Sequence, residues 1–256
     1  MMPWLFRRQR KRRKLDCLPW VNGRERGLNA FEKCYFSQNG EDGIIAEIFA
    51  RIGTTNRFSA EIGVEDGREC NTALLLRDEG WSGVLVEGDP ERYARLRKRF
   101  RRYRNVRPLQ AYVDVENVVG VLAEGGVPER FDLLSVDIDG NDWWILRTLL
   151  GRYRPRVVIA EINPFYPPPA RWVMPYDPAH RWDDTTYFGA SLCSMVDLHR
   201  EHGYAFAAAD CNIVNAFFVD REEFPKLGLP EAVPEEVYHF TPSFPGRAYG
   251  YAGRKP

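Results

Sequence analysis

The segment between residues 59 and 90 constrains the fold of this chain most. One apolar run ends in an acid and two glycines, and a second apolar run ends in another acid; these four residues are Glu61, Gly63, Gly67 and Glu87. Two strands joined by one helix, with glycines after the first strand and an acid after the second, form the half-fold that binds an adenosine and holds its ribose hydroxyls on the acid. The sequence therefore predicts an adenosine-cofactor site; the alternative is a corner that uses glycine only for its backbone angles.

The residues between the two glycines indicate which cofactor binds. Dinucleotide sites carry three glycines, so that a pyrophosphate lies against bare backbone amides at a helix N-terminus. Here only Gly63 and Gly67 are present, and Glu65 and Asp66 stand between them. Their charges repel a pyrophosphate but suit a ligand that carries a sulfonium and an ammonium. The segment favours S-adenosylmethionine over NAD.

Hydrophobic periodicity predicts strands that alternate with helices. We expect strands over 57–62, 83–86, 106–112, 131–138 and 157–160, and helices over 42–52, 71–79, 90–103, 118–124, 143–150 and 191–201. The apolar segment after Gly203 and the segment 215–219 are separated by so few residues that they must pair antiparallel. The predicted fold class is α/β: a Rossmann-like, seven-stranded, mostly parallel sheet with a C-terminal antiparallel hairpin, the arrangement of class I methyltransferases.

Composition divides the chain into three parts. We expect a flexible basic arm over 1–30, one domain over 31–222 with a Pro-rich, aromatic lid loop at 163–188, and a Pro-rich tail over 223–256. The formal net charge is zero, yet the arm holds seven cations between Arg7 and Lys14. We interpret the arm as a solvated tail or a weak contact to an anionic surface, and the basic helix 90–103 as a solvated face. No nucleic-acid partner is expected.

The apolar runs and the cysteines indicate the compartment. Every apolar run is shorter than the roughly 18 residues that a membrane span needs, and no secretory apolar core follows the basic arm. We therefore expect a cytoplasmic protein. The cysteines are odd in number and never in C-x-x-C spacing, which predicts neither a disulfide framework nor a zinc site; they are Cys17, Cys34, Cys70, Cys193 and Cys211.

Four stretches, in their order and spacing, resemble the FkbM-type methyltransferases. They are residues 37–42 (Ser-Gln-Asn-Gly-Glu-Asp), 61–72 with both glycines, 80–87, and 137–140 (Asp-Ile-Asp-Gly), and together they cover roughly residues 36–164. The resemblance implies S-adenosylmethionine in the glycine loop and O-methylation of a hydroxyl on a sugar or natural product. It implies contacts to the methionine end, the ribose and the adenine edge of the cofactor from Glu61, Gly63, Gly67, Asn71, Glu87, Asp114 and Asp137.

Methyl transfer to a hydroxyl needs a side chain that aligns the hydroxyl and accepts its proton. We expect this base at the carboxyl ends of strands four and five, where Asp139, Asp142 and Glu161 stand. His180 of the lid loop is a further candidate, with a surface position as the alternative. The catalytic candidates are therefore Glu161, Asp139 and His180.

Hard oxygen ligands gather at the same two strand ends. Asp139, Glu161 and Asn163 offer the donors that Mg²⁺ prefers, and Asp137 can take part. A bound Mg²⁺ would lower the proton affinity of the acceptor. The alternative is that these polar side chains only cap neighbouring strands through hydrogen bonds.

The leading hypothesis is an S-adenosylmethionine-dependent O-methyltransferase with a small-molecule or glycosidic acceptor. The lid aromatics form either a wall over that acceptor or the loop's own packing: Phe165, Tyr166, Trp172 and Trp182. A hypothesis of a different class is a non-catalytic Rossmann-like binding module that uses the aromatic loop and the basic arm as contact surfaces. The glycines and Glu87 argue against that module, and the missing third glycine and the terminal hairpin argue against a nicotinamide oxidoreductase.

Overall fold

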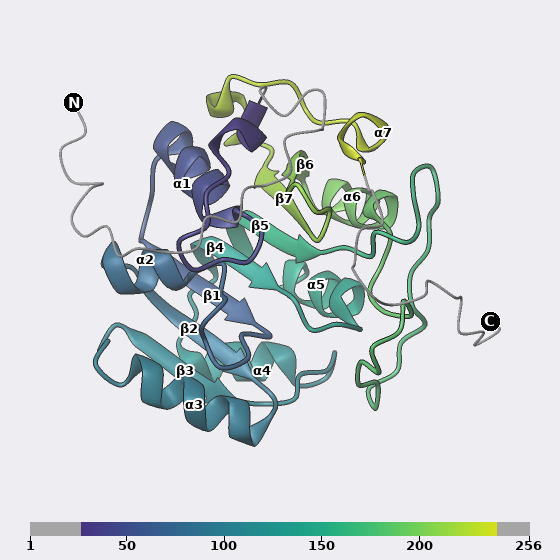
Figure 1. Cartoon of the computed structure of the whole chain (residues 1–256). Helices are drawn as coiled ribbons and strands as arrows, with labels where there is room; N and C mark the ends of the chain where they lie inside the picture. The colour runs from purple at the N-terminus through teal and green to yellow at the C-terminus, as the bar shows by residue number, and fades with distance from the viewer. Residues whose placement is uncertain (1–26, 240–256) are drawn as a thin grey trace.

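The computed structural model describes residues 27–239, so the predictions for the basic run, for Cys17 and for residues 240–256 lie outside the described part. Within that part the chain forms a seven-stranded sheet with helices on both faces (Figure 1). The strands are β1 (Phe58–Ile62), β2 (Ser82–Glu87), β3 (Val106–Gln110), β4 (Arg130–Val136), β5 (Arg154–Glu161), β6 (Tyr204–Ala209) and β7 (Asn215–Asp220).

The strand order is β3-β2-β1-β4-β5-β7-β6. All neighbours from β3 to β5 pair in parallel, whereas β7 runs antiparallel to both β5 and β6. The connection of residues 210–214 is too short for a crossover helix, which is why the last two strands form a hairpin. The predicted α/β fold, mostly parallel with a C-terminal antiparallel hairpin, is confirmed.

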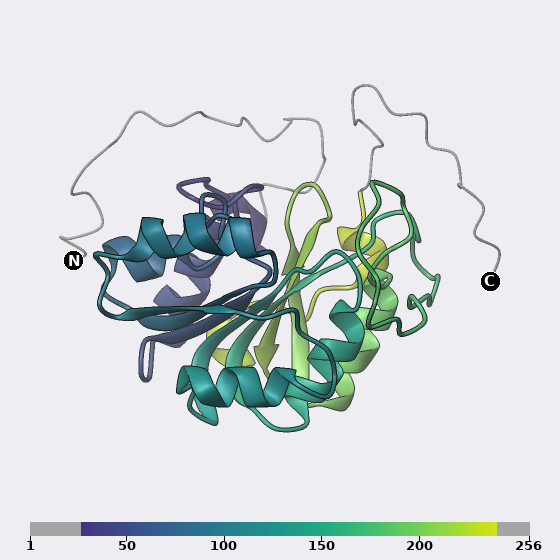
Figure 2. The same ribbon diagram turned by 90° about the horizontal axis from the view of Figure 1, so that it is seen from below.

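Helices cover the two faces of the sheet in separate layers (Figure 2). One layer holds α1 (Glu41–Ile52), α2 (Ala73–Asp78) and α3 (Pro90–Phe100), and the other holds α4 (Val118–Gly125), α5 (Asp142–Leu150) and α6 (Leu192–Glu201). Central strands are therefore buried on both sides: in β5, Val157 packs into one core and Val158 into the other. This burial explains the nearly continuous apolar runs of the sequence.

The helix boundaries follow local hydrogen bonds. The helix expected over 71–79 begins two residues later, because the backbone N–H groups of Asn71 and Thr72 donate to the carboxylate of Glu61. Helix α3 begins as expected at Pro90, where Asp89 accepts two backbone N–H groups of the first turn. It ends at Phe100, three residues earlier than expected.

Short elements beyond both expected domain boundaries pack against the same body. They are η1 (Gly27–Phe31), η2 (Phe224–Leu227) and α7 (Pro234–Val237). Leu28 and Leu227 are each 2% exposed and belong to the core on the α1 side, and the guanidinium of Arg51 donates to the carbonyl oxygen of Leu227 at 2.7 Å. No helix among residues 27–239 is long and apolar enough to cross a membrane.

Candidate functional site

The carboxyl ends of β1 and β4 mark the point where the sheet changes direction. From β1 the chain proceeds to β2 and β3 on one side and returns to β4 on the other, and ligands bind outside the strand ends at such a point. Gly63 lies there with a φ of 85°, and a Cβ on it would stand 1.6 Å from the carbonyl oxygen of Asp137. Only glycine allows this approach, so two predicted site residues, Gly63 and Asp137, are direct neighbours.

Packing explains why the second position of the loop is a glycine. Gly67 has a φ of 74°, and a Cβ on it would stand 2.6 Å from a methyl carbon of Leu96 in α3. Because Gly67 has no Cβ, α3 can lie against the loop. From the same helix, Arg92 forms an exposed ion pair with Glu65 at 3.2 Å, a partner that the sequence reasoning about the loop's charges did not include.

Four strands carry an acid at or next to their carboxyl end, on one face of the sheet. Side chains alternate between the faces of a strand, and the residue before each acid packs into the core on the α4 side, so the acids face the α1 side. The register pairs Glu61 with Ser135 and Val136 with Ala160, which sets the ends of β1, β4 and β5 side by side. This row of acids comprises Glu87, Glu61, Asp137 and Glu161.

None of these four acids forms an ion pair with another of residues 27–239. Burial raises the pKa of Glu61 to about 7 and also raises the pKa of Glu87. Burial, and then the neighbouring carboxylates, raise the pKa of Asp137 and of Glu161 well above their usual values. Buried carboxylates without a cation are costly in the charged form. The row therefore suits a ligand that brings positive charge.

Glu61 and Asn71 are joined in one hydrogen-bonded group. The carboxylate of Glu61 accepts the N–H of Asn71 at 2.8 Å, the N–H of Thr72 at 3.0 Å and the Thr72 hydroxyl at 2.5 Å. The Asn71 side chain donates to the hydroxyl oxygen of Ser135 at 3.1 Å. These contacts hold the start of α2 beside β1 and β4. A cofactor contact of Glu61 or Asn71 stays a prediction.

The far end of the row lies between β2 and β3. Glu87 accepts the N–H of Asp89 at 2.8 Å. A Cβ on Gly88 would stand 2.4 Å from the ring of Tyr112, so this ring, which is 51% exposed, lies over the backbone after Glu87. Sequence reasoning did not name Tyr112 as a site residue. The pattern that could have indicated it is an aromatic side chain close after the third strand. The carboxylate of Asp114 accepts two N–H groups of the turn before α4, at 2.8 Å each.

The sequence candidates at β4 and β5 meet in a carboxylate cluster. Carboxylate oxygens of Asp137, Asp139 and Glu161 lie within 4.8 Å of one another. The backbone N–H of Asp139 donates to Glu161 at 3.0 Å, and Asp139 itself has a φ of 52°, in the left-handed region. Asp142 fixes this turn, because its carboxylate accepts two of the turn's N–H groups at 2.8 and 2.9 Å. The three clustered acids are the hard oxygen donors that a divalent cation prefers.

Asn163, also a candidate ligand, joins the two ends of the lid loop. Its side-chain nitrogen donates to the carbonyl oxygens of Thr186 and Phe188 at 2.9 and 2.7 Å, and its side-chain oxygen accepts the N–H of Phe165 at 2.9 Å. Every polar group of the amide is thereby bonded within the loop. Asp137 is the third acid of the cluster with Asp139 and Glu161, and a metal contact of Asn163 stays a prediction.

The lid loop docks across the strand ends. Its His180 reaches the site: the ring Nε2 lies 3.1 Å from the carbonyl oxygen of Asp139. A Cβ on Gly140 would stand 2.5 Å from the same ring. The next lid residue, Arg181, places its guanidinium 4.1 Å from the ring centre of Tyr112. The loop therefore contacts the segments that follow β4 and β3.

Three lid aromatics pack on one another. Tyr166 stacks on Trp172 with ring centres 4.1 Å apart, and Trp172 meets Tyr187 edge to face at 5.7 Å. These contacts favour the loop's own packing for two of the four aromatics proposed as an acceptor wall. Trp182 is 47% exposed, and its indole N–H donates to the carbonyl oxygen of Thr185.

Residues 37–42, the first stretch of the family resemblance (here called the lead-in), lie at the carboxyl-terminal edge of the sheet on the α1 side. The carboxylate of Asp42 accepts the N–H groups of three preceding residues, and burial raises its pKa to about 6. Glu41 accepts side-chain N–H groups of Asn39 at 3.1 Å and of Asn215, at the start of β7, at 2.9 Å. The lead-in thus connects α1 to the terminal hairpin, a contact that spans more than 170 residues and that sequence reasoning missed.

Comparison with known proteins finds similarity only among solved structures. Neither a protein-family model nor a curated protein matches the chain. Similar structures include the N-terminal domain of EvdMO1 in the presence of SAH and D-fucose (14% identity, 70% of this chain and 80% of that chain, TM-score 0.45), the O-methyltransferase from Bacillus cereus in complex with SAH (15%, 74% and 83%, 0.45) and the CcbJ methyltransferase from Streptomyces caelestis (15%, 72% and 97%, 0.41).

With TM-scores below 0.5, none of these similarities assigns an activity. The fold is defined by the strand order, with β1 central and β7 antiparallel between β5 and β6. The chain has the class I methyltransferase fold.

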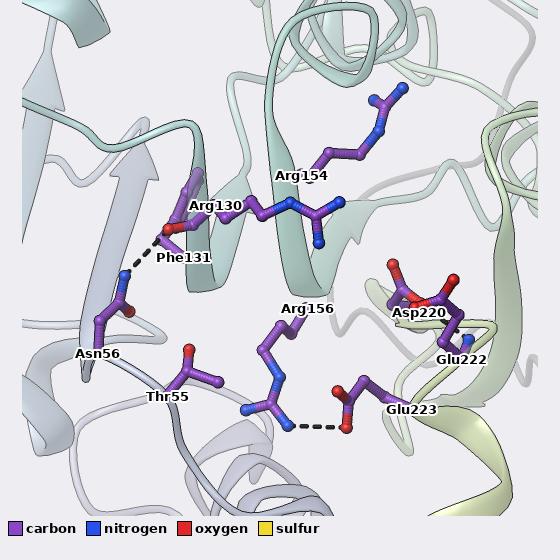
Figure 3. A pocket seen from close by; sticks show the side chains of 9 residues that line it. All are labelled: Thr55, Asn56, Arg130, Phe131, Arg154, Arg156, Asp220, Glu222 and Glu223. Carbon is purple, nitrogen blue, oxygen red and sulfur yellow. Dashed lines mark hydrogen bonds and ion pairs between the residues drawn. The ribbon is translucent and has the colours of Figure 1, made fainter.

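The amino-terminal edge of this methyltransferase fold holds a hollow of about 370 Å³ (Figure 3). Its lining residues are Thr55, Asn56, Arg130, Phe131, Arg154, Arg156, Asp220, Glu222 and Glu223. The guanidinium of Arg156 bonds the buried carboxylate of Asp132 at 2.9 Å and that of Glu223 at 2.8 Å. These charges compensate one another and fasten η2 to the sheet, and no predicted site residue lines the hollow.

Proposed function

We propose that this chain is an S-adenosylmethionine-dependent methyltransferase of the FkbM type, which methylates a hydroxyl on a sugar or natural product. The observation that carries the proposal is the row of acids, three buried and Asp137 partly buried, which have no ion-pair partner in residues 27–239 and lie at the switch point beside the glycine loop. A sulfonium and an ammonium would supply the positive charge that this row lacks. A pyrophosphate would meet like charge there.

The residues around the row fit an adenosine ligand. When bound, S-adenosylmethionine supplies a methyl group activated by its sulfonium. Glu87 closes β2, and in this proposal its carboxylate accepts hydrogen bonds from ribose hydroxyls. Tyr112, whose ring lies beside Gly88 and under the guanidinium of Arg181, borders the region after Glu87 where the base would bind. Glu61, through Thr72 and Asn71, keeps the loop and α2 in place.

Glu161 and Asp139 are the proposed proton acceptors. A carboxylate whose pKa is raised holds a proton more tightly, and burial raises the pKa of both groups. The proton of the acceptor hydroxyl would pass to one of them as its oxygen takes the methyl group, whose bond to the sulfonium sulfur breaks so that the sulfur leaves as a neutral thioether. His180 lies against the carbonyl of Asp139 and closes the lid over these carboxylates. A closed lid excludes water from the reacting groups.

In a second form of this proposal, a divalent cation binds at the carboxylate cluster. The carboxylates of Asp137, Asp139 and Glu161 form a donor set of hard oxygens within 4.8 Å of one another, which fits Mg²⁺. A cation held there would neutralise the cluster and lower the proton affinity of an acceptor hydroxyl.

Calorimetric titration of the purified chain with S-adenosylmethionine, S-adenosylhomocysteine and NAD, with and without Mg²⁺, tests the proposal. We expect saturable binding of the first two ligands and none of NAD. A dependence on Mg²⁺ would support the cation form. Binding of none of the three would contradict the proposal and favour the non-catalytic binding module.

A further inference from the structure

A second hollow, of about 510 Å³, lies between the glycine loop and the exposed side of α3. Its lining contains six cations and one acid: Arg68, Arg95, Lys98, Arg99, Arg101, Arg102 and Asp66, together with Tyr103. In Figure 1, α3 lies at the margin of the molecule, at the end of the sheet formed by β3 and β2. This concentration of positive charge is separate from the acidic strand ends.

Helical spacing arranges these cations in a row. Arg95, Lys98 and Arg102 follow one another at intervals of three and four residues, so they share one face of α3 and the turn after it. Seven residues of helix extend about 10 Å. Arg68 approaches the row from the glycine loop. Cations from two separate segments therefore converge on one hollow.

Part of this charge has no acidic partner. Asp66 is bonded by Arg68 and by Arg99, at 3.2 Å each, and the Arg95 guanidinium lies 3.8 Å from Glu91. Lys98, Arg101 and Arg102 are exposed and form no ion pair with any residue between 27 and 239. Three uncompensated cations beside three compensated ones raise the local potential and attract an anion with several charges.

We propose that this hollow binds a compact ligand that carries two or more phosphate groups. Guanidinium groups match phosphate oxygens with paired hydrogen bonds, and the volume is that of a small-ligand site. A membrane surface is a poorer match, because the exposed large hydrophobic side chains of the described chain lie outside α3: Phe31, Tyr112, Trp182 and Val233. The basic helix is then a binding surface, not only a solvated face, and this inference does not depend on the methyltransferase proposal.

The test is a calorimetric titration of the whole chain with inorganic tripolyphosphate at physiological salt. The lining variant Lys98→Gln/Arg102→Gln is compared with Arg97→Gln/Arg104→Gln, which removes the same charge from exposed positions outside the hollow. We expect one saturable site, weakened about tenfold or more in the first variant and less than about twofold in the second. Neither variant touches the arginines that hold Asp66.

Three results would overturn the proposal. They are an absence of saturable binding, an equal loss in both variants, and binding only to vesicles of phosphatidylcholine with 30% phosphatidylserine, which would make the helix a lipid-surface contact. Circular dichroism and thermal unfolding of both variants establish that they fold. Tripolyphosphate binding that is lost with the lining variant in the absence of vesicles supports a free phosphate compound as the ligand.

Discussion

The two edges of the sheet differ in whether their buried acids are paired with a cation. At the amino-terminal edge, the fully buried Asp132 is bonded by Arg156 at 2.9 Å and by the backbone N–H of Arg57 at 2.7 Å. At the carboxyl-terminal edge, Glu61 and Glu161 are almost as buried, yet no cation of the described chain pairs with them. Charge that is compensated within the chain stabilises the fold, and charge that is left uncompensated at a switch point is available to a ligand.

Side chains and backbone are bonded differently at the two edges. Arg156 also donates to the carbonyl oxygens of Ile52 and Gly53, at 3.0 and 2.8 Å, so the compensated edge is bonded to the end of α1. At the acidic edge Gly63 lies against a carbonyl oxygen and Asp139 is in the left-handed region, which Arg57 at the compensated edge also adopts with a φ of 50°. Local strain of this kind persists where the surrounding structure imposes it, often at functional sites.

The largest expected effect comes from breaking the compensated edge. Arg156→Ala leaves Asp132 buried without a cation and should lower the free energy of unfolding by roughly 3 to 5 kcal/mol. Chemical denaturation measures this change. The control is Arg152→Ala, which breaks the exposed pair with Glu129 and should cost less than about 1 kcal/mol. Equal losses in the two variants would mean that burial does not distinguish the pairs.

Glu161→Gln should act in the opposite way at the acidic edge. The amide oxygen can still accept the N–H of Asp139, and a buried charge is removed, so the stability at pH 8 should stay the same or rise. On any acceptor that the wild type methylates, the rate should fall about 10²-fold or more, because the proton acceptor is lost. A loss of stability as large as that of Arg156→Ala would show that Glu161 has a structural role.

The pH dependence of stability should have opposite signs at the two edges. Burial raises the pKa of Glu61 from 4.5 to about 7, so its contribution is fully present below pH 4.5 and is lost as the pH rises through about 7; the loss is roughly 3 kcal/mol. The hydrogen bond from Arg156 lowers the pKa of Glu223, whose contribution is present above pH 4.5 and is lost as the pH falls.

Unfolding of the ligand-free chain at pH values from 5 to 8 measures the first of these effects. We expect stability to fall over this range, and we expect Glu61→Gln to make the dependence shallower. Stability that rises from pH 5 to 8 would contradict the raised pKa values of the acidic edge.

The smallest expected effect concerns cofactor affinity. Glu87→Ala should weaken binding of S-adenosylmethionine by roughly 1 to 3 kcal/mol, the cost of losing charge-assisted hydrogen bonds to the ribose. Calorimetric titration measures it, with Glu91→Ala on exposed α3 as the control. An unchanged affinity in the Glu87 variant would show that the adenosine does not bind at the end of β2.

Much of the fold could be predicted because its signals are local. The apolar run at 157–160 lies inside β5, and the spacing of isoleucines over 42–52 lies on α1. The hairpin of β6 and β7 followed from the length of one connection. Boundaries were less exact where a distant side chain decided them, as when Glu61 bonded the residues before α2.

The site could be predicted in part, for the same reason. Strand ends carry acids in the sequence itself, so Glu61, Glu87 and Glu161 were candidates from their positions. That Asp137 lies close to Asp139 and Glu161, and that Asn163 bonds both ends of the lid loop, depends by contrast on tertiary contacts. No local sequence pattern indicates these contacts.

The sequence by itself determined which residues form strands and helices, where the glycine turn lies, and which strands end in acids, because these depend on the period and chemistry of neighbouring residues. Only the tertiary structure decided that Arg156 meets Asp132, that Arg181 meets Tyr112, and that Glu41 meets Asn215. Such pairs arise when strand order and docking bring distant segments together, and burial then sets the energy of every charge between them.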